Sequence, residues 1–288
     1  MRDYANTILF LAHHTSDDCF LDLISKALSD LFEGLNPVTF EGDTGAINRV
    51  ISEAPALEYE GGAPSEHRER RNRARDQIDR ENGGDDGLAE REEVSEKLSV
   101  SAEITVLLKT TEILGQILKN QYATIKRAKK QELIKAQFNG PLRAIKGFFN
   151  ELGSAPDRLV NLVKKAMEKQ GGGATAQERD KAARRVAAEL AQGVTFGLIA
   201  ITAQNTNADD LKDDIYSVVE ANGTKAFALI ELAVLLDSAM PLPKRQLEEL
   251  YLSSKEDVVV SRLIKILVLN RLYMSRRTKL ICSGSAPS

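Results

Sequence analysis

The residues best suited to chemistry lie close together near the N-terminus, where their types match those of a metal site. The cluster consists of His13, His14, Asp17, Asp18 and Cys19. Two adjacent residues of a helix point about 100° apart, so His13 and His14 cannot readily bind one ion together. No two histidines have the H-x-x-x-H spacing that would place both on one helical face. We therefore interpret the cluster as a helix end with its capping turn, and we predict no bound metal.

Histidine and serine chemistry has little support elsewhere in the sequence. The third and last histidine, His67, lies in a charged segment without apolar periodicity. None of the three histidines follows an arginine by four to six residues, which is the spacing of helical ribonucleases of the HEPN kind. The G-x-S-x-G motif of serine hydrolases is absent. We therefore predict that the chain is not an enzyme, and carboxylates or tyrosines in a helical cleft are left as the enzymatic alternative.

Nucleotide binding by a P-loop is also excluded. The motif G-x-x-x-x-G-K-[ST], whose backbone N–H groups surround the phosphates, does not occur. Gly223, Thr224 and Lys225 have the right types, but their order is reversed and the upstream glycine is missing. The apolar run Leu232–Asp237 resembles the strand whose final Asp holds magnesium, but it lies within a helical pattern. We predict no cofactor.

The main electrostatic feature is a basic segment from Lys119 to Lys169. It holds 12 Lys or Arg against 4 Asp or Glu, a net charge of +8 that leaves −11 for the remainder, since the whole chain carries −3. A surface of this kind could bind phosphate backbones and release counterions. It could equally be a solvated helical face or pair with an acidic surface. The residues that define this basic face are Lys126, Arg127, Lys129, Lys130, Lys135, Arg143 and Lys146.

The composition indicates that helices position these residues. The chain has 288 residues, of which 42% are hydrophobic, 28% charged and only 5% aromatic, and this is typical of packed helices. Cys19 and Cys282 lie too far apart in the sequence to suggest a disulfide framework. Asp3 argues against a signal peptide, and the longest apolar stretches, 194–202 and 227–236, are shorter than the ~20 residues of a membrane span. We therefore expect a cytoplasmic, all-α protein that does not contact a membrane.

Apolar periodicity and turn residues divide the chain into short, adjacent helices. Asp43 is the expected N-cap of the third helix, while Asn139, Gly140 and Pro141 are expected to separate two helices. Gly115 inside a helix costs about 1 kcal/mol relative to Ala, a cost that the close approach of another helix could offset. The expected helices cover residues 4–14, 17–32, 44–51, 95–120, 121–138, 141–152, 156–170, 176–204, 208–221, 224–237, 243–253 and 255–274.

One boundary is especially clear. Gly223 is expected to end a helix and Thr224 to cap the next one, because Gly adopts the left-handed conformation and Thr accepts a hydrogen bond from a free N–H group. The helix that follows is apolar almost all round between Ala226 and Leu236. It should therefore be the most buried helix of the second half of the chain.

Five segments follow from these patterns, arranged as a multi-helix bundle or an irregular solenoid of helical pairs. The charged linker carries six arginines between Arg68 and Arg80, followed by acidic residues. It is expected to be disordered and solvated, with a nucleic-acid-binding arm as the alternative. The segments are an N-terminal helical segment (1–53), the charged linker (54–94), a helical bundle with the basic face (95–170), a C-terminal helical bundle (174–281) and a disordered tail (282–288).

Four stretches together resemble the C-terminal helical region of bacterial STAND-type (NACHT-like) P-loop NTPases. They are Arg2–Ala12 (RDYANTILFLA), Lys109–Tyr122 (KTTEILGQILKNQY), Ala221–Asp237 (ANGTKAFALIELAVLLD) and Ile266–Tyr273 (ILVLNRLY). In that family the C-terminal helices sense a trigger or a partner, the ATPase transduces the signal and an N-terminal effector acts, often in antiphage defence. The resemblance covers helical strings and carries no phosphate-binding residue.

The resemblance implies a non-enzymatic helical sensor or protein-interaction module. No ATPase module precedes Arg2, so we expect either the C-terminal part of a longer protein or a separate partner that acts in trans on a P-loop NTPase. The alternative function is nucleic-acid binding through the basic face of residues 119–169.

Overall fold

The computed structural model describes residues 18–52, 99–169, 175–238 and 241–274, together with the single residues 66, 69 and 73. This part of the chain contains ten α-helices, one 3₁₀ turn and no strand, which confirms the predicted all-α class. The elements are α2 (Asp18–Asp30), α3 (Gly45–Ser52), α6 (Ser99–Asn120), α7 (Arg127–Ser154), α8 (Pro156–Lys169), α9 (Ala176–Thr206), η2 (Asp209–Leu211), α10 (Lys212–Asn222), α11 (Lys225–Asp237), α12 (Lys244–Ser253) and α13 (Val258–Met274).

Several predictions concern residues near the chain ends and in the linker, most of which lie outside the described ranges. The expected helix 4–14 and the tail 282–288 lie outside the described residues. Within the expected linker, Glu66, Glu69 and Arg73 are helical, and Arg73 pairs with Glu69 at 3.3 Å, one helical turn apart. The rest of the linker lies outside the described part of the chain.

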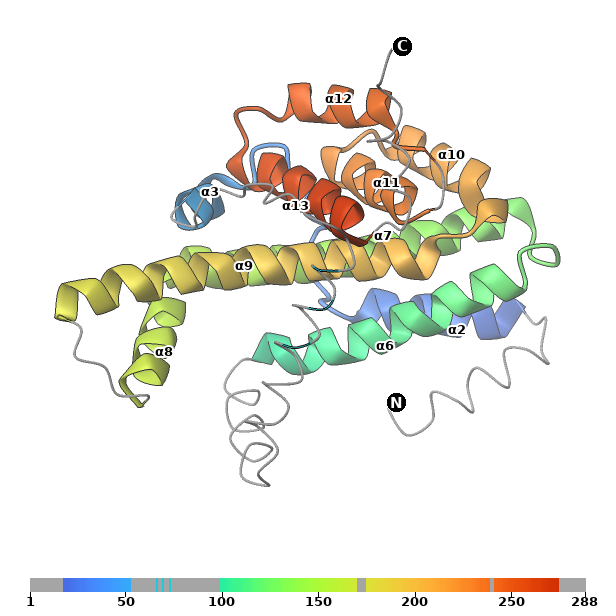
Figure 1. Ribbon diagram of the computed structural model, residues 1–288. Helices are drawn as coiled ribbons and strands as arrows, with labels where there is room; N and C mark the ends of the chain where they lie inside the picture. The colour runs from blue at the N-terminus through green and yellow to red at the C-terminus, as the bar shows by residue number, and fades with distance from the viewer. Residues whose placement is uncertain are drawn as a thin grey trace, which may run out of the picture.

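The helices form three layers, and two long, neighbouring helices, α7 and α9, make up the middle one (Figure 1). One outer layer consists of α2 and α6, and the opposite layer consists of α3 with α10 to α13. Helix α8 and the first half of α9 project from this body as a hairpin, whose own small apolar cluster includes Val160, Val163, Ala183 and Ala187. The middle layer therefore contacts nearly every other element.

A single cluster of buried side chains runs through all three layers, from Leu21 in α2 to Leu267 in α13. It includes side chains from both of the expected bundles, 95–170 and 174–281. Helix α11 lies inside it, and eight of its 13 residues are buried, as its apolar sequence predicts. Gly223 has the expected positive φ of 64°, and the Thr224 side chain accepts from the backbone N–H of Phe227 at 3.4 Å. Both sequence signals at this boundary are confirmed.

The predicted break at residues 139–141 is wrong. Helix α7 continues through Gly140 and Pro141. It begins at Arg127, and residues 121–125, which were expected to be helical, form a turn. Pro141 has no N–H group to donate to the preceding turn, which ordinarily disrupts a helix. Here Gly140 and Pro141 are both buried, with Leu28 of α2 directly beside Gly140. Tertiary packing therefore outweighs the local stop signal.

Asp43, the predicted N-cap of α3, has a different role in the structure. Asp43 accepts through Oδ2 from the backbone N–H of Thr39 at 3.0 Å, and the same carboxylate lies 3.7 Å from Lys146. Thr44 is the residue that closes the first turn, because its carbonyl accepts from the N–H of Asn48 at 2.7 Å. The Thr44 hydroxyl in turn donates to Asp257 at 2.5 Å, which joins α3 to the start of α13.

Helices α6 and α9 approach each other closely at Gly115. A Cβ atom on Gly115 would lie 2.3 Å from the backbone oxygen of Asn205 in α9, far inside van der Waals contact. Helices α6 and α9 therefore cross at a distance that only glycine permits. Burial gained at this crossing offsets the low helix propensity of glycine.

Helix α9 has 31 residues and is long and apolar enough, by length and composition alone, to cross a membrane. This differs from the expectation that every apolar stretch is too short. Half of its most apolar window is buried inside the protein, as in the core helices of many soluble proteins, so the feature is weak evidence for a membrane. It is the one helix with this property in the described ranges.

The first prediction concerns Gly115. Gly115→Ala should lower the free energy of unfolding by about 1–3 kcal/mol, because the new methyl group overpacks the crossing with α9. Urea unfolding followed by circular dichroism measures the change. The matched control is Gly193→Ala in α9, where nothing lies within 4 Å of the new Cβ atom. That variant should gain up to about 1 kcal/mol from helix propensity. A Gly115→Ala protein as stable as the Gly193→Ala protein would contradict the close crossing.

Candidate interaction sites

The basic face does not form one open surface in the structure. Five of its seven residues contact acceptors within the protein, namely Arg127, Lys129, Lys130, Arg143 and Lys146. Lys126 and Lys135 are exposed and make no ion pair with the described residues. Of the alternatives open at the level of the sequence, pairing with an acidic surface fits best, and the acidic surface belongs to the same chain.

The centre of this pairing is Asp214 in α10, whose side chain is only 7% exposed. Its Oδ1 accepts from Arg127 Nε and from Gln131 Nε2, each at 3.2 Å. Its Oδ2 lies 3.2 Å from Lys130 Nζ. Three side chains from the first turns of α7 thus converge on one nearly buried carboxylate, which offsets the cost of removing its charge from water.

Two further members of the basic face, Lys129 and Arg143, contact α2. Lys129 pairs with Asp22 of α2, and Arg143 donates to the carbonyl of Ser29 at 2.7 Å, near the C-terminal end of α2. A cation is favourable there because the carbonyl groups at a helix C-terminus carry partial negative charge. Burial lowers the pKa of Arg143. The positive charge therefore stabilises contacts between helices.

The residues singled out in the sequence as candidates for metal or nucleotide chemistry do not form such a site among the described residues. No group of three His, Cys, Asp or Glu side chains that could hold a metal occurs there. His13, His14 and Asp17 of the N-terminal cluster lie outside the described residues, and Cys19 is exposed on α2. Gly223, Thr224 and Lys225 form a helix boundary, and Asp237 ends a helix and not a strand.

An apolar groove of about 500 Å³ lies between α12 and α13. Its apolar lining consists of Leu247 and Tyr251 from α12 and of Ile264, Val268 and Leu269 from α13. The groove exists because α12 packs loosely: Leu250 is its single fully buried residue. Lys244, Glu248 and Lys265 border the groove, so its rim carries a net positive charge. This is the most apolar of the hollows described here.

A second groove, about 480 Å³, lies on the other side of α12, against α10 and α11. It contains the half-buried Glu231 together with Glu220 and Glu249. Burial raises the pKa of Glu231, because the ionised carboxylate loses hydration there. Helix α12 is thus flanked by two grooves, and the second is lined by three glutamates against one lysine, Lys225.

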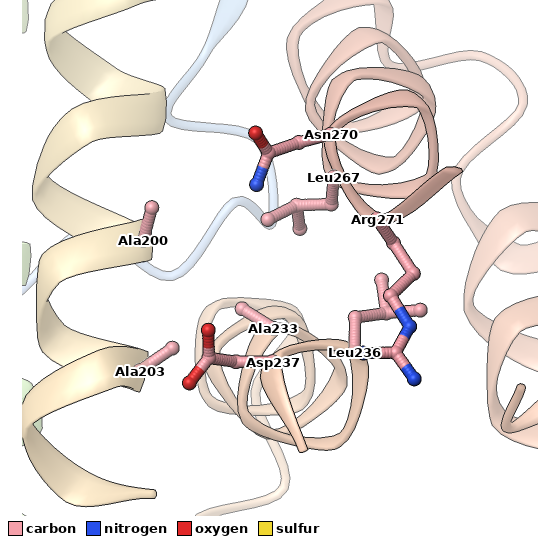
Figure 2. A pocket seen from close by; sticks show the side chains of 8 residues that line it. All are labelled: Ala200, Ala203, Ala233, Leu236, Asp237, Leu267, Asn270 and Arg271. Carbon is pink, nitrogen blue, oxygen red and sulfur yellow. The ribbon is translucent and has the colours of Figure 1, made fainter. Parts of the chain in front are cut away.

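A smaller pocket of about 230 Å³ lies between α9, α11 and α13 (Figure 2) and is partly open to solvent. Its walls are Ala200, Ala203, Ala233, Leu236 and Leu267. Three polar side chains complete the lining: Asp237, Asn270 and Arg271. The Asp237 carboxylate and the Asn270 amide extend into the same space beside the alanines of α9 (Figure 2).

Comparisons of the chain with protein-family models, with curated proteins and with solved structures give no match. The relationship to STAND-type NTPases therefore stays a prediction.

The sequence carries a signal for the Asp214 site that was not among the predicted functional residues. Asp214 occupies an apolar stripe with Leu211, Ile215, Val218 and Val219, which recur at the spacing of one helical face. A carboxylate on a core-facing stripe requires a cationic partner. The groove and the pocket have no comparable signal, since each combines helices whose relative placement periodicity does not reveal.

The second prediction concerns the buried carboxylate. Asp214→Asn should lower the free energy of unfolding by about 1–3 kcal/mol, because Lys130 and Arg127 lose a charged acceptor. The matched control is Asp213→Asn, an exposed carboxylate in the same first turn of α10, which corrects for the interaction with the helix dipole. Chemical unfolding of both variants measures the difference. Equal stabilities would contradict the role of Asp214 as a shared acceptor.

The third prediction concerns pH. The pKa of Glu231 is higher in the folded protein than in the unfolded chain, so the folded state binds this proton more tightly. The stability that results is complete below the ordinary carboxyl pKa. It is lost as the pH rises through the raised pKa. Glu231→Gln should therefore stabilise the protein at pH 7, and the gain should disappear toward pH 4. Thermal unfolding between about pH 4 and pH 8 tests this. The exposed Glu220→Gln is the control, and a pH-independent effect of Glu231→Gln would refute the prediction.

Proposed function

We propose that this chain is a non-enzymatic helical interaction module that binds an amphipathic helix of a partner protein in the groove between α12 and α13. The observation that carries the proposal is the apolar lining of this groove by Leu247, Tyr251, Ile264, Val268 and Leu269. Docking of an amphipathic helix into an apolar groove is a common mode of peptide recognition, in which residues spaced three or four apart serve as anchors.

The charge on the rim specifies the partner helix further. Lys244 on α12 and Lys265 on α13 flank the groove, against one carboxylate, Glu248. A helix with acidic residues on both sides of its apolar stripe would place carboxylates near both lysines. The occupant is therefore an apolar helical face with a net negative border.

The resemblance to the helical regions of STAND-type NTPases supplies the class of partner. We place the acidic amphipathic helix on a P-loop NTPase, in cis or in trans, and assign the chain a regulatory role in the cytoplasm in the setting of antiphage defence. Nucleic-acid binding is not favoured, because most of the basic face already has partners within the protein.

The fourth prediction tests the groove and the partner together. Tagged wild-type, Leu269→Gln and Leu252→Gln proteins are used for affinity capture from native cells after nuclease treatment, and retained chains are identified by mass spectrometry. Leu269 lines the groove, whereas Leu252 is 52% exposed on α12 and does not line it. A P-loop NTPase should be retained by wild type and by Leu252→Gln, and about tenfold less by Leu269→Gln, since one buried leucine contributes about 1.5–3 kcal/mol.

Two results would contradict the proposal. Equal recovery of the NTPase with all three proteins would exclude the groove as its binding site. Absence of any P-loop NTPase from the wild-type sample would exclude the assigned partner. Circular dichroism of Leu269→Gln, compared with Leu252→Gln, shows whether the variant is folded.

A further inference from the structure

We propose that α12 is a movable strap, which detaches from α10, α11 and α13 as a unit while the rest of the protein stays folded. The strap carries Leu247 and Tyr251, which form one wall of the apolar groove, so the groove exists only while α12 is in place. The inference concerns this wall and is tested without any partner, so it goes beyond the proposed function and stands separately from it.

Helix α12 is attached to the protein by little buried surface. It lies at the outer edge of its layer (Figure 1), and Leu250 is the single fully buried residue among its 10. By contrast, the neighbouring α11 buries eight of its 13 residues. Leu247 and Tyr251 pack against the same apolar cluster as Leu250, but they are only partly buried. Segments with few buried apolar contacts are the ones that open locally in native proteins.

Open grooves run along both sides of α12. The groove toward α13 has a volume of about 500 Å³, and the groove toward α10 and α11 has a volume of about 480 Å³. Leu250 borders the second groove together with Val219 of α10 and Ala228 of α11. The helix therefore rests on a narrow line of contact between two open spaces, and its detachment would join them into one trough.

The sequence of α12 adds little helical stability of its own. Pro243, the residue before it, makes no side-chain capping hydrogen bond, and Lys244 and Arg245 place cations at the positive end of the helix dipole. Arg245 pairs with Glu249 at 2.8 Å, but both side chains are largely exposed, and such a pair contributes little. With 10 residues, α12 is also shorter than the roughly 12–15 residues that an isolated helix needs in water. Once detached from its neighbours, α12 would therefore unfold.

Both ends of the strap are held in place. Ser238, directly after α11, and Ser254, directly after α12, are buried. The start of α13 is fixed further, because the Asp257 carboxylate accepts from the Thr44 hydroxyl at 2.5 Å and from the backbone N–H of Val260 at 3.1 Å. Fixed ends and a loosely packed middle allow α12 to open without unfolding α11 or α13.

The fifth prediction is tested by native-state hydrogen exchange of the full chain, read by mass spectrometry of peptides from α11 and α12. Corrected for intrinsic rates, the backbone N–H groups of α12 should exchange at least about tenfold faster than those of α11, because they require only a local opening. Urea at concentrations below the unfolding transition should accelerate exchange in α11 but change it little in α12, since a local opening exposes little surface. Leu250→Ala should accelerate exchange in α12 at least about tenfold, because closing no longer buries a leucine. Leu252→Ala, which truncates an exposed leucine of the same helix, is the matched control and should exchange as wild type does.

Two results would overturn the inference. The first is equal protection and equal urea dependence in α11 and α12 of the wild-type protein, because α12 would then open only when the whole chain unfolds. The second is unchanged exchange in α12 of Leu250→Ala, shown by circular dichroism to be folded, because α12 would then fray without leaving its seat. The wild-type comparison decides the question even where Leu250→Ala does not fold. Neither result involves a P-loop NTPase, so failure here leaves the groove proposal untouched.

Discussion

The architecture depends on how closely helix backbones approach one another in the middle layer. At Gly115 the separation between α6 and α9 leaves no room for a methyl group, because its Cβ atom would lie 2.3 Å from a backbone oxygen. Gly140 and Gly147 of α7 are less crowded, with flexible leucine side chains 3.0–3.1 Å from the added atom. Helix α9 also packs against α11 and α13, so its position relative to α6 determines where the opposite layer lies. The pocket between α9, α11 and α13 lies directly against this helix.

Charge has a structural role that its distribution along the sequence does not show. The basic segment appears in the sequence as an excess of +8, the signature of a surface that attracts anions. In the folded chain the first turns of α7 place Arg127 and Lys130 against Asp214, while Arg143 reaches the end of α2. Part of the positive charge of this segment thereby contacts acceptors in other helices of the same chain, and these contacts connect the three layers.

Local sequence signals predicted those elements whose own residues determine them. Gly223 and Thr224 define a boundary through their own conformation and hydrogen bonding, and the apolar helix after them could only be buried. Pro141 failed as a stop signal because its environment, supplied by distant residues such as Leu28 in α2, favours a continuous helix. The groove and the pocket were not predicted, for the same reason. Periodicity identifies the apolar face of a helix, but it does not identify which other helix packs against that face.

Helix α13 separates two unlike compartments. Leu267, Asn270 and Arg271 face the small pocket, while Val268 and Leu269, adjacent in sequence, face the apolar groove. A helix is a stiff element, so a rotation about its axis moves both sets of side chains at once. Thermodynamic linkage makes the effect mutual: if an occupant of one compartment changes affinity in the other, the second must change the first by the same factor. A wall one helix thick therefore makes the shapes of the two hollows depend on each other.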